Sequence, residues 1–284
     1  MQTAEAIRYH YDVGNDFYRL WLDGSLSYSC AFQEPGDSLE QAQDRKLRWH
    51  LDAVDADEAR SLLDIGCGWG GLLERASLGR GVDRCVGLTL SDEQAQHVRS
   101  RAIPGVEVFT KNWRDYQPPE HVDAIVSIGA FEHFARPTDS PTDKIAIYRE
   151  FFTRCAGWLT DGGVLSLQTI AYANMSPSDA NGFIANDIFP DADLPTLAEI
   201  ATATDEIFEI VTLRNDRADY AWTCEEWAAR LRAQRPQAVD LVGDDVVQRY
   251  ERYLKMSALG FRMGKIGLLR IVLRPYVGHF GGRR

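Results

Sequence analysis

The sequence lacks several features that would place it at once in a particular class of protein. It has only five cysteines, an odd number without a Cys-x-x-Cys pair, which argues against a disulfide framework and a structural zinc site. It has no run of about eighteen apolar residues, so we expect no membrane-spanning helix. Its first residues lack a basic segment followed by an apolar one, so we expect no secretory signal. These absences predict a cytoplasmic protein with free thiols and without a metal site.

Positive charge is also scarce, because 31 Lys and Arg face 42 Asp and Glu, for a net charge of -11. Nucleic acid is therefore a poor partner, since binding phosphates requires clustered basic residues. The charge is uneven, however: no acidic residue follows Glu251, whereas eight basic residues do. Two interpretations of this stretch stay open. It is a solvated tail and outer strand face, or a patch for an anionic group on an acceptor, such as a phospholipid headgroup, pyrophosphate or phosphopantetheine.

What the chain does contain is a regular alternation of short apolar runs and helical patterns. Such alternation predicts an α/β fold with a doubly wound, mostly parallel sheet. We expect strands near 61–65, 84–90, 106–109, 122–128, 162–168, 208–213 and 266–273. We expect helices near 69–79, 92–101, 143–159, 223–234 and 241–258, and a largely helical pattern over residues 1–50.

The stretch SLLDIGCGWG, residues 61–70, carries the clearest motif. Its apolar residues read as a buried strand that turns sharply into a helix, and glycine recurs at Gly66, Gly68 and Gly70. Glycine tolerates a positive φ and has no Cβ, so a ligand can lie against bare backbone here. The spacing differs from the dinucleotide motif G-x-G-x-x-G. With Asp64 it forms Asp-x-Gly-x-Gly-x-Gly, the first motif of methyltransferases that use S-adenosylmethionine (SAM). A tight strand–helix turn without a ligand is the alternative.

Other strand ends are expected at the same edge of the sheet, where ligands of open α/β folds bind. Thr89 and Gln94 could bind the ribose or amino-acid part of SAM, although Ser91 and Gln94 also have the spacing of a capping box. Trp113 could stack on the adenine or belong to the core. Glu132 directly follows a buried strand, so it is a candidate general acid or base, or else a helix-start carboxylate.

Five motifs in order make the resemblance specific: Tyr9-His10-Tyr11-Asp12-Val13, Tyr28-Ser29-Cys30, LDIGCGWG at 63–70, GLTLS at 87–91 and SIGAFEHF at 127–134. Together they resemble the cyclopropane-fatty-acid synthase family, which includes the mycolic acid cyclopropane synthases. Ile188-Phe189-Pro190, Leu194-Pro195 and Arg249-Tyr250 continue the similarity, which therefore covers nearly the whole chain.

The resemblance implies a class I methyltransferase fold, Rossmann-like and seven-stranded, with a helical cap over a hydrophobic acceptor tunnel. It implies that the SAM site is lined, besides Asp64, by Tyr28, Gly66, Gly68, Thr89, Leu90, Gln94, Trp113 and Ile128. In that family the methyl group goes to an alkene carbon, and a bound bicarbonate serves as the base. The bicarbonate cradle maps onto Cys30, Glu132, Ile170 and Tyr253, and the family's histidine corresponds to Gln168 in this chain.

The resemblance also implies a domain plan. Residues 1–55 would form an N-terminal segment over the SAM and acceptor sites, and 56–170 the SAM-binding core. Residues 171–205 would be a lid insertion, and 206–284 the end of the sheet with a helical cap at 217–258. The chain departs from the family in three places. Gln168 replaces the histidine and cannot titrate near neutrality. The segment between Ile170 and Ile188 is shorter, and the loop 135–144 is longer.

These observations predict a SAM-dependent methyltransferase that acts on a carbon of a hydrophobic acceptor. The acceptor would be an unsaturated acyl lipid or a terpenoid- or polyketide-like metabolite. Two alternatives remain open. One is N- or O-methylation of a small amine or alcohol, and the other is a SAM-binding protein that transfers no methyl group. The sequence does not predict an oligomeric state.

Overall fold

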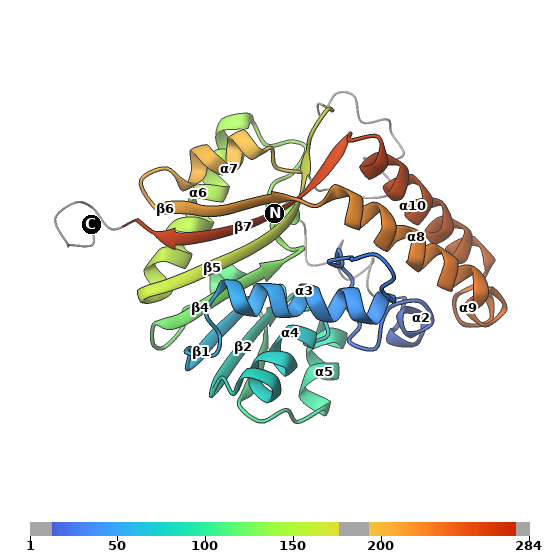
Figure 1. Ribbon diagram of the computed structural model, residues 1–284, viewed down its shortest axis with the longest axis horizontal. Coiled ribbons are helices and arrows are strands. Elements are labelled where there is room, and N and C mark those ends of the chain that lie inside the picture. The colour runs from blue at the N-terminus through green and yellow to red at the C-terminus, as the bar shows by residue number, and fades with distance from the viewer. Residues whose placement is uncertain (1–12, 176–192, 277–284) are drawn as a thin grey trace.

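A seven-stranded sheet forms the centre of the computed structural model, which describes residues 13–175 and 193–276 (Figure 1). The strand order is β3-β2-β1-β4-β5-β7-β6. Only β7 runs antiparallel to its neighbours. The strands are β1 (Ser61–Ile65), β2 (Arg84–Thr89), β3 (Val106–Thr110), β4 (Val122–Ile128), β5 (Leu159–Tyr172), β6 (Phe208–Asn215) and β7 (Ile266–Pro275). The prediction of a doubly wound, mostly parallel α/β sheet is therefore confirmed.

Helices cover both faces of the sheet, which is why its central strands are largely apolar. All five residues of β1 are buried, and alternate residues face opposite layers. Leu62 packs in a cluster with α3 (Leu39–Ala53), α4 (Gly71–Glu74) and α5 (Asp92–Ser100). Leu63 packs in another with α6 (Pro141–Trp158) and α7 (Leu197–Thr204). The chain crosses from one layer to the other between β1 and β4, and that switch point is where ligands of such sheets bind.

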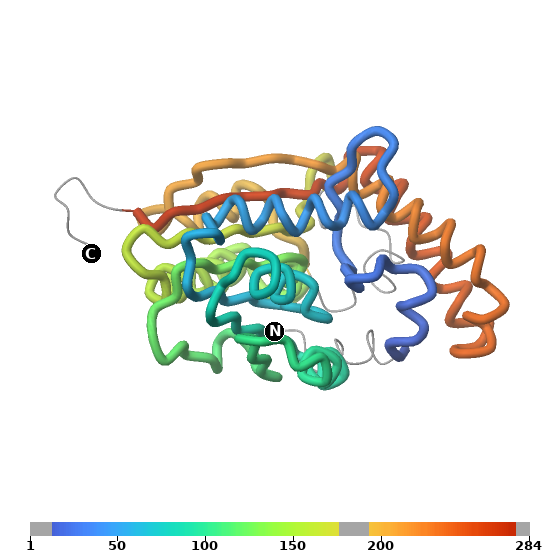
Figure 2. The backbone as a smooth tube through the Cα atoms, turned by 60° about the horizontal axis from the view of Figure 1, so that its bottom comes forward, coloured from blue at the N-terminus to red at the C-terminus, as the bar shows by residue number. Residues whose placement is uncertain are grey.

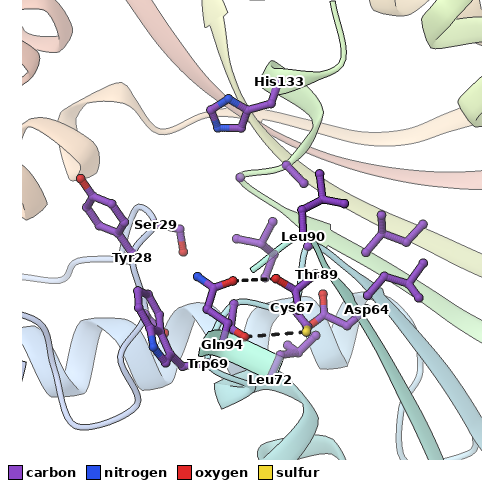
Figure 3. Close-up of a pocket in the computed structure, with 18 of the residues that line it drawn as sticks. Tyr28, Ser29, Asp64, Cys67, Trp69, Leu72, Thr89, Leu90, Gln94 and His133 are labelled. Carbon is purple, nitrogen blue, oxygen red and sulfur yellow. Dashed lines mark hydrogen bonds between the residues drawn. The ribbon is translucent and has the colours of Figure 1, made fainter. Parts of the chain in front are cut away.

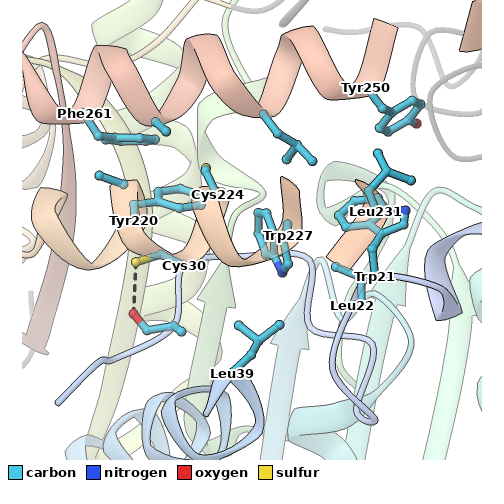
Figure 4. Packing of buried hydrophobic residues seen from close by; sticks show 14 of the residues in the cluster. Trp21, Leu22, Cys30, Leu39, Tyr220, Cys224, Trp227, Leu231, Tyr250 and Phe261 are labelled. Atoms are coloured by element: carbon cyan, nitrogen blue, oxygen red, sulfur yellow. Dashed lines mark hydrogen bonds between the residues drawn. The ribbon is translucent and has the colours of Figure 1, made fainter. Parts of the chain in front are cut away.

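A helical cap stands at one end of the sheet, between β6 and β7. It consists of α8 (Arg217–Ala233), α9 (Arg235–Val242) and α10 (Asp244–Arg262). The short helix α2 (Asn15–Arg19) lies at the same end, as Figure 2 shows. An aromatic cluster joins these elements: the ring centroids of Trp21 and Trp227 are 5.8 Å apart, and those of Phe17 and Tyr250 are 5.0 Å apart (Figure 4). The cap therefore has a hydrophobic core of its own, which also fixes the N-terminal segment.

The cap contains three helices where the sequence predicted two. The first starts at Arg217 instead of near residue 223, directly after β6. The second predicted helix, 241–258, corresponds to α10, which starts after Gly243, whose φ of 83° lies outside the helical region. The helix α9 lies almost wholly in the interval between the two predicted helices. The proline of α9 stands at the start of that short helix, where its missing N–H costs nothing. Both differences concern breaks that a local helical pattern does not show.

The N-terminal segment is less helical than predicted. Between α2 and α3 the chain contains no α-helix, and its polar residues bond the local backbone instead. Asp23, for example, accepts a hydrogen bond from the backbone N–H of Ser27 at 3.0 Å. Residues 176–192 lie outside the described residues, as do residues 1–12 and 277–284. The lid insertion, the shortening of that segment and the Ile188-Phe189-Pro190 match thus stay predictions.

In residues 13–175 and 193–276, no helix combines the length and the apolar composition that crossing a membrane requires.

Candidate active site

A cavity opens at the carboxyl ends of β1, β2 and β4, where the sequence predicted a ligand site (Figure 3). The register pairs Ile65 of β1 with Leu88 of β2, so these strands end at the same level. The loop 25–29 closes one side, and the cap closes another through Tyr220 and Tyr253. Elements that are far apart in the chain therefore meet around one space.

The glycine loop presents bare backbone to this cavity. Gly66, Gly68 and Gly70 have φ angles of 86°, 53° and 80°, a region that glycine adopts easily. A Cβ on Gly66 would lie 2.5 Å from the Cβ of Ala130, and one on Gly70 would lie 2.8 Å from Val98. A Cβ on Gly68 would meet nothing within 4 Å. Packing thus requires the outer two glycines, whereas Gly68 borders open space.

Thr89 and Gln94 are joined by a hydrogen bond between their side chains. The Thr89 hydroxyl donates to Oε1 of Gln94 at 2.7 Å, and Oγ of Ser91 accepts from the backbone N–H of Gln94 at 3.3 Å. Ser91 therefore caps α5. The Gln94 side chain bonds Thr89 and turns to the cavity, where both residues are part of the wall. Leu90 and Ile128 lie in the same wall.

Trp113 belongs to the core and also lines the cavity, so the core interpretation is confirmed and stacking on the adenine stays a prediction. It is buried, with its ring centroid 5.2 Å from that of Phe134 and 5.4 Å from that of Phe151. The guanidinium of Arg114 lies 4.9 Å from the Trp113 ring. The ring is therefore fixed at the edge of the cavity before any ligand enters.

A buried carboxylate and a buried amine face the cavity beside the glycine loop. Asp64 is 2% exposed, and its Oδ1 has no hydrogen-bond partner in the described part of the chain. Burial raises the pKa of Asp64 to about 7, although nearby Lys46 lowers it. Lys46 comes from α3 and is 2% exposed. Its Nζ donates to the hydroxyls of Ser29 at 3.1 Å and Ser27 at 3.3 Å.

The sequence did not single out Lys46, because a lysine in an amphipathic helix normally faces water. The sequence did not single out Tyr220 either, because it lies inside a helix of the cap and belongs to none of the five motifs. The one available indication was that Lys46 falls on the buried side of α3, in line with Ala42, Gln43 and Leu47.

The far side of the cavity holds Glu132, which is 3% exposed. Its Oε2 accepts a hydrogen bond from the Thr169 hydroxyl at 3.0 Å, and its carboxylate also accepts from the backbone N–H of Ile170. Burial raises the pKa of Glu132 to about 7, because these hydrogen bonds offset only part of the desolvation. A carboxyl with that pKa exchanges protons near neutrality.

Three tyrosines surround the space next to Glu132: Tyr28, Tyr220 and Tyr253. Burial raises the pKa of Tyr28 well above its usual value, and a hydrogen bond with Tyr253 adds to this. Burial likewise raises the pKa of Tyr220. The hydroxyls of Tyr28 and Tyr220 therefore stay neutral. The three tyrosines and Ile170 form a mostly apolar wall.

Cys30 and Gln168, which the resemblance assigned to the bicarbonate cradle, are not among the residues that line the cavity. Both are buried against Arg270, which is fully buried itself. The Arg270 guanidinium donates to Oε1 of Gln168 at 2.9 Å, to the backbone oxygen of Ala31 at 2.7 Å and to that of Cys30 at 3.4 Å, and it pairs with Asp216.

The side-chain oxygen of Gln168 is therefore already hydrogen-bonded to another residue of the protein, Arg270. Its Oε1 also lies 3.4 Å from Nε2 of His50. Burial raises the pKa of the Cys30 thiol to about 12 despite the nearby Arg270, so the thiol stays protonated. The structure therefore brings Glu132, Ile170 and Tyr253 together at the cavity and separates Cys30 and Gln168 from it. Within residues 13–175 and 193–276, no cluster of His, Cys, Asp and Glu side chains could hold a metal ion.

The chain is similar to known proteins in both sequence and structure. The family model "Mycolic acid cyclopropane synthetase" matches residues 1–271. Cyclopropane mycolic acid synthase 1 of Mycobacterium tuberculosis is 34% identical over 279 residues, which cover 92% of this chain and 93% of that protein. A probable fatty acid methyltransferase of Pseudomonas putida is 34% identical over 290 residues, which cover 97% of this chain and 71% of that protein.

Solved structures agree with this result. Mycolic acid cyclopropane synthase CmaA1, complexed with SAH and CTAB, superposes with a TM-score of 0.86 at 32% identity, covering 96% of this chain and 98% of that one. Cyclopropane synthase MmaA2 from Mycobacterium tuberculosis gives a TM-score of 0.85 at 32% identity, with coverage of 96% and 98%. Coclaurine N-methyltransferase gives 0.76 at 21% identity, covering 92% of this chain and 80% of that one, and so shares the fold.

Proposed function

The chain belongs to the mycolic acid cyclopropane synthetase family, as its motifs predicted, and from this premise we propose that it transfers the methyl group of SAM to an alkene carbon of a hydrophobic acceptor. One observation carries the proposal. A single cavity has bare glycine backbone and a buried acidic residue at one end, and a buried carboxylate within a largely apolar wall at the other. The relative CmaA1 was solved with SAH, the product form of this cofactor, and with the long-chain amphiphile CTAB.

The residues at the glycine end fit SAM. Open space beside Gly68 accommodates a ligand, and the unpartnered Oδ1 of Asp64 offers a buried acceptor for a positively charged group. Thr89, Gln94 and the fixed ring of Trp113 supply polar and stacking contacts for the nucleoside, with Leu90, Ile128 and Tyr28 completing the wall. When bound, SAM supplies a methyl group on a positively charged sulfur, whose C–S electron pair stays with sulfur as the acceptor's π electrons form the new bond.

The tyrosine end suits a weak nucleophile. An alkene reacts poorly with a methyl donor, so the protein contributes mainly by holding the acceptor in line and excluding water. Methyl addition leaves a positive charge on the acceptor carbon. The π faces of Tyr28, Tyr220 and Tyr253 and the carboxylate of Glu132 can stabilise that charge.

We assign the removal of a proton to Glu132. If a C–H bond of the added methyl group breaks, its electron pair closes a three-membered ring with the positive carbon. If a C–H bond on a carbon next to the positive carbon breaks, its electron pair forms a double bond. In both cases the proton goes to the Glu132 carboxylate. A pKa of about 7 leaves about half of this group ionised near neutral pH, while Thr169 and Ile170 hold it in place.

Bicarbonate does not fit well as the base in this chain. Of the residues that the resemblance assigns to its cradle, Glu132, Ile170 and Tyr253 line the cavity, but the side chain of Gln168 is bound to Arg270 and His50. Glu132 already provides a carboxylate of suitable basicity at the cavity. We therefore route no step through bicarbonate and expect turnover to depend on Glu132 and not on added bicarbonate.

For the acceptor we propose an unsaturated acyl lipid, with a terpenoid- or polyketide-like olefin as the other candidate. Methylation of a small amine or alcohol is not favoured, because the one N-methyltransferase compared above shares only the fold at 21% identity. A SAM-binding protein without turnover is not favoured either, because it leaves the buried Glu132 carboxylate without a purpose.

The test is an incubation with methyl-labelled SAM and matched phospholipids. Vesicles with cis-unsaturated chains are compared with vesicles that have the same headgroup and saturated chains. We expect label in the acyl chains of the unsaturated lipid only, with stoichiometric SAH. Fragment masses locate the methyl group, so a methyl on nitrogen or oxygen would rule out alkene chemistry. Failure of the protein to bind SAM or SAH would dispose of the proposal altogether.

A further inference from the structure

Lys46 is a buried amine for which the proposed reaction has no use. Its side chain leaves α3 on the buried side of the helix and ends at the cavity wall. An ammonium group has three protons to donate, but Nζ bonds only the hydroxyls of Ser27 and Ser29. These partners are neutral, and Lys46 forms no ion pair with a carboxylate in the described part of the chain. Burying a cation in this way is costly unless something completes its pairing.

Asp64 presents the opposite situation a short way along the same wall. Its carboxylate is buried, and its Oδ1 accepts no hydrogen bond from the described residues. The two groups influence each other, because Lys46 lowers the pKa of Asp64 and Asp64 raises that of Lys46. Burial nevertheless dominates both, raising the pKa of Asp64 to about 7 and lowering that of Lys46 to about 8. The cavity thus offers one incompletely paired cationic and one incompletely paired anionic group.

The methionine portion of SAM and SAH is a zwitterion with one α-ammonium and one α-carboxylate group. We propose that Lys46, together with the Ser29 hydroxyl, binds the α-carboxylate, and that Asp64 binds the α-ammonium group. Each buried charge then gains the partner that it lacks, and the two contacts fix the direction of the amino-acid end. The methyl-bearing sulfur is held through this end, so Lys46 is a positioning residue for the cofactor and takes no part in the transfer itself.

This inference rests on the proposed function, since it assumes that SAH binds. Isothermal titration of the wild-type protein with three ligands distinguishes failure of this inference from failure of the proposed function. SAH carries both charged groups, decarboxylated SAH lacks only the carboxylate, and methylthioadenosine lacks the whole amino-acid end. We expect SAH to bind at least about 10-fold more tightly than decarboxylated SAH, because a charge-assisted bond to a buried group is worth about 1.5 to 3 kcal/mol.

The decisive variant is Lys46→Met, which keeps an unbranched side chain out to Cε and removes the ammonium group. We expect it to weaken SAH binding about 10- to 100-fold and to leave decarboxylated SAH binding unchanged or improved. Lys255→Met, at an exposed position of α10, is the matched control and should bind all three ligands as the wild type does. Thermal melting establishes that both variants are folded.

The outcomes are distinct. If Lys46→Met weakens SAH and decarboxylated SAH equally, Lys46 merely supports the wall and the inference is overturned. Equal affinity of the wild type for these two ligands overturns it as well, even if the variant does not fold. If the wild type binds none of the three ligands, the proposed function fails first.

Discussion

Two clusters of buried charge in this molecule look alike in composition and differ in how completely they are paired. Around Arg270, every nitrogen of a fully buried guanidinium donates to a defined acceptor on Gln168, Asp216, Cys30 or Ala31. Around the glycine loop, Lys46 bonds only neutral hydroxyls and Asp64 keeps an unpartnered oxygen. The fully hydrogen-bonded network around Arg270 stabilises the fold. We propose that a ligand completes the pairing of Lys46 and Asp64.

The comparison also explains the change at position 168. Where the family resemblance predicts a histidine at the reaction site, this chain has an amide that bonds Arg270 of β7 and lies near His50 of α3. Gln168 of β5 connects β7 and α3 and does not line the cavity. In the proposed reaction, proton transfer is therefore assigned to Glu132, which has hydrogen-bond partners but still has a raised pKa.

Removing Arg270 should have the largest effect on stability. Arg270→Met removes a fully buried donor and strands the oxygens of Gln168 and Ala31. Asp216 keeps its ion pair with Arg214. Because each buried acceptor left without a donor costs about 1 to 3 kcal/mol, we expect the free energy of unfolding to fall by about 2 to 5 kcal/mol in denaturant titrations. Arg274→Met on the same strand is the control, because that side chain is 55% exposed and its ion pair with Asp55 spans 3.9 Å. It should cost less than about 1 kcal/mol, and similar losses in the two variants would contradict the comparison.

At the cavity, Glu132→Gln should mainly affect chemistry. The amide keeps the shape of the side chain but cannot accept the proton, so kcat should fall at least about 100-fold. SAH affinity should change little, because Glu132 lies on the acceptor side of the cavity. Steady-state kinetics and titration calorimetry measure the two effects separately.

Asp64→Ala provides the contrast, since it should weaken SAH binding first and affect kcat less once SAM is saturating. A large rise in the SAH dissociation constant of Glu132→Gln would contradict this placement. Glu120→Gln, at a side chain that is 78% exposed, should leave both quantities unchanged.

Stability should depend on pH through the same carboxyl. The folded-state pKa of Glu132, about 7, lies above its unfolded value, so the folded state binds the extra proton between these values. The contribution of Glu132 to stability is therefore present at acid pH and is lost as the pH rises to 7. Glu132→Gln should exceed the wild type in unfolding free energy by about 3 kcal/mol at pH 8, and the gap should nearly close by pH 4.5. A gap that is constant across this range would show that folding leaves the pKa of Glu132 unchanged.

Two glycine substitutions should give local effects of different kinds. Gly68→Ala adds a methyl group beside open space, so the protein should fold with a loss of about 1 kcal/mol from backbone strain. SAH affinity should nevertheless fall about 10-fold, because the methyl group occupies ligand space. Gly66→Ala is its counterpart, since its methyl group collides with Ala130 and should destabilise the fold itself. Unaltered SAH binding by Gly68→Ala would show that the ligand lies elsewhere.

Much of this molecule was determined locally by the sequence. The strands at 61–65 and 122–128 follow from continuous apolar runs, and the positive φ angles at Gly66, Gly68 and Gly70 follow from residues that alone adopt them easily. Strand ends in a parallel sheet meet at one edge, so the proximity of Asp64, Thr89 and Glu132 was also predictable.

Only the tertiary structure decided which polar groups would be buried and how they would be paired. Lys46 looks like an ordinary surface lysine until the loop 25–29 covers it, and Gln168 is withdrawn from the reaction site by Arg270, a residue about one hundred positions further along. Tyr220 lines the cavity because the cap stands at the end of the sheet where the cavity opens. Burial and pairing are relations between distant segments, and no local pattern of residues contains them.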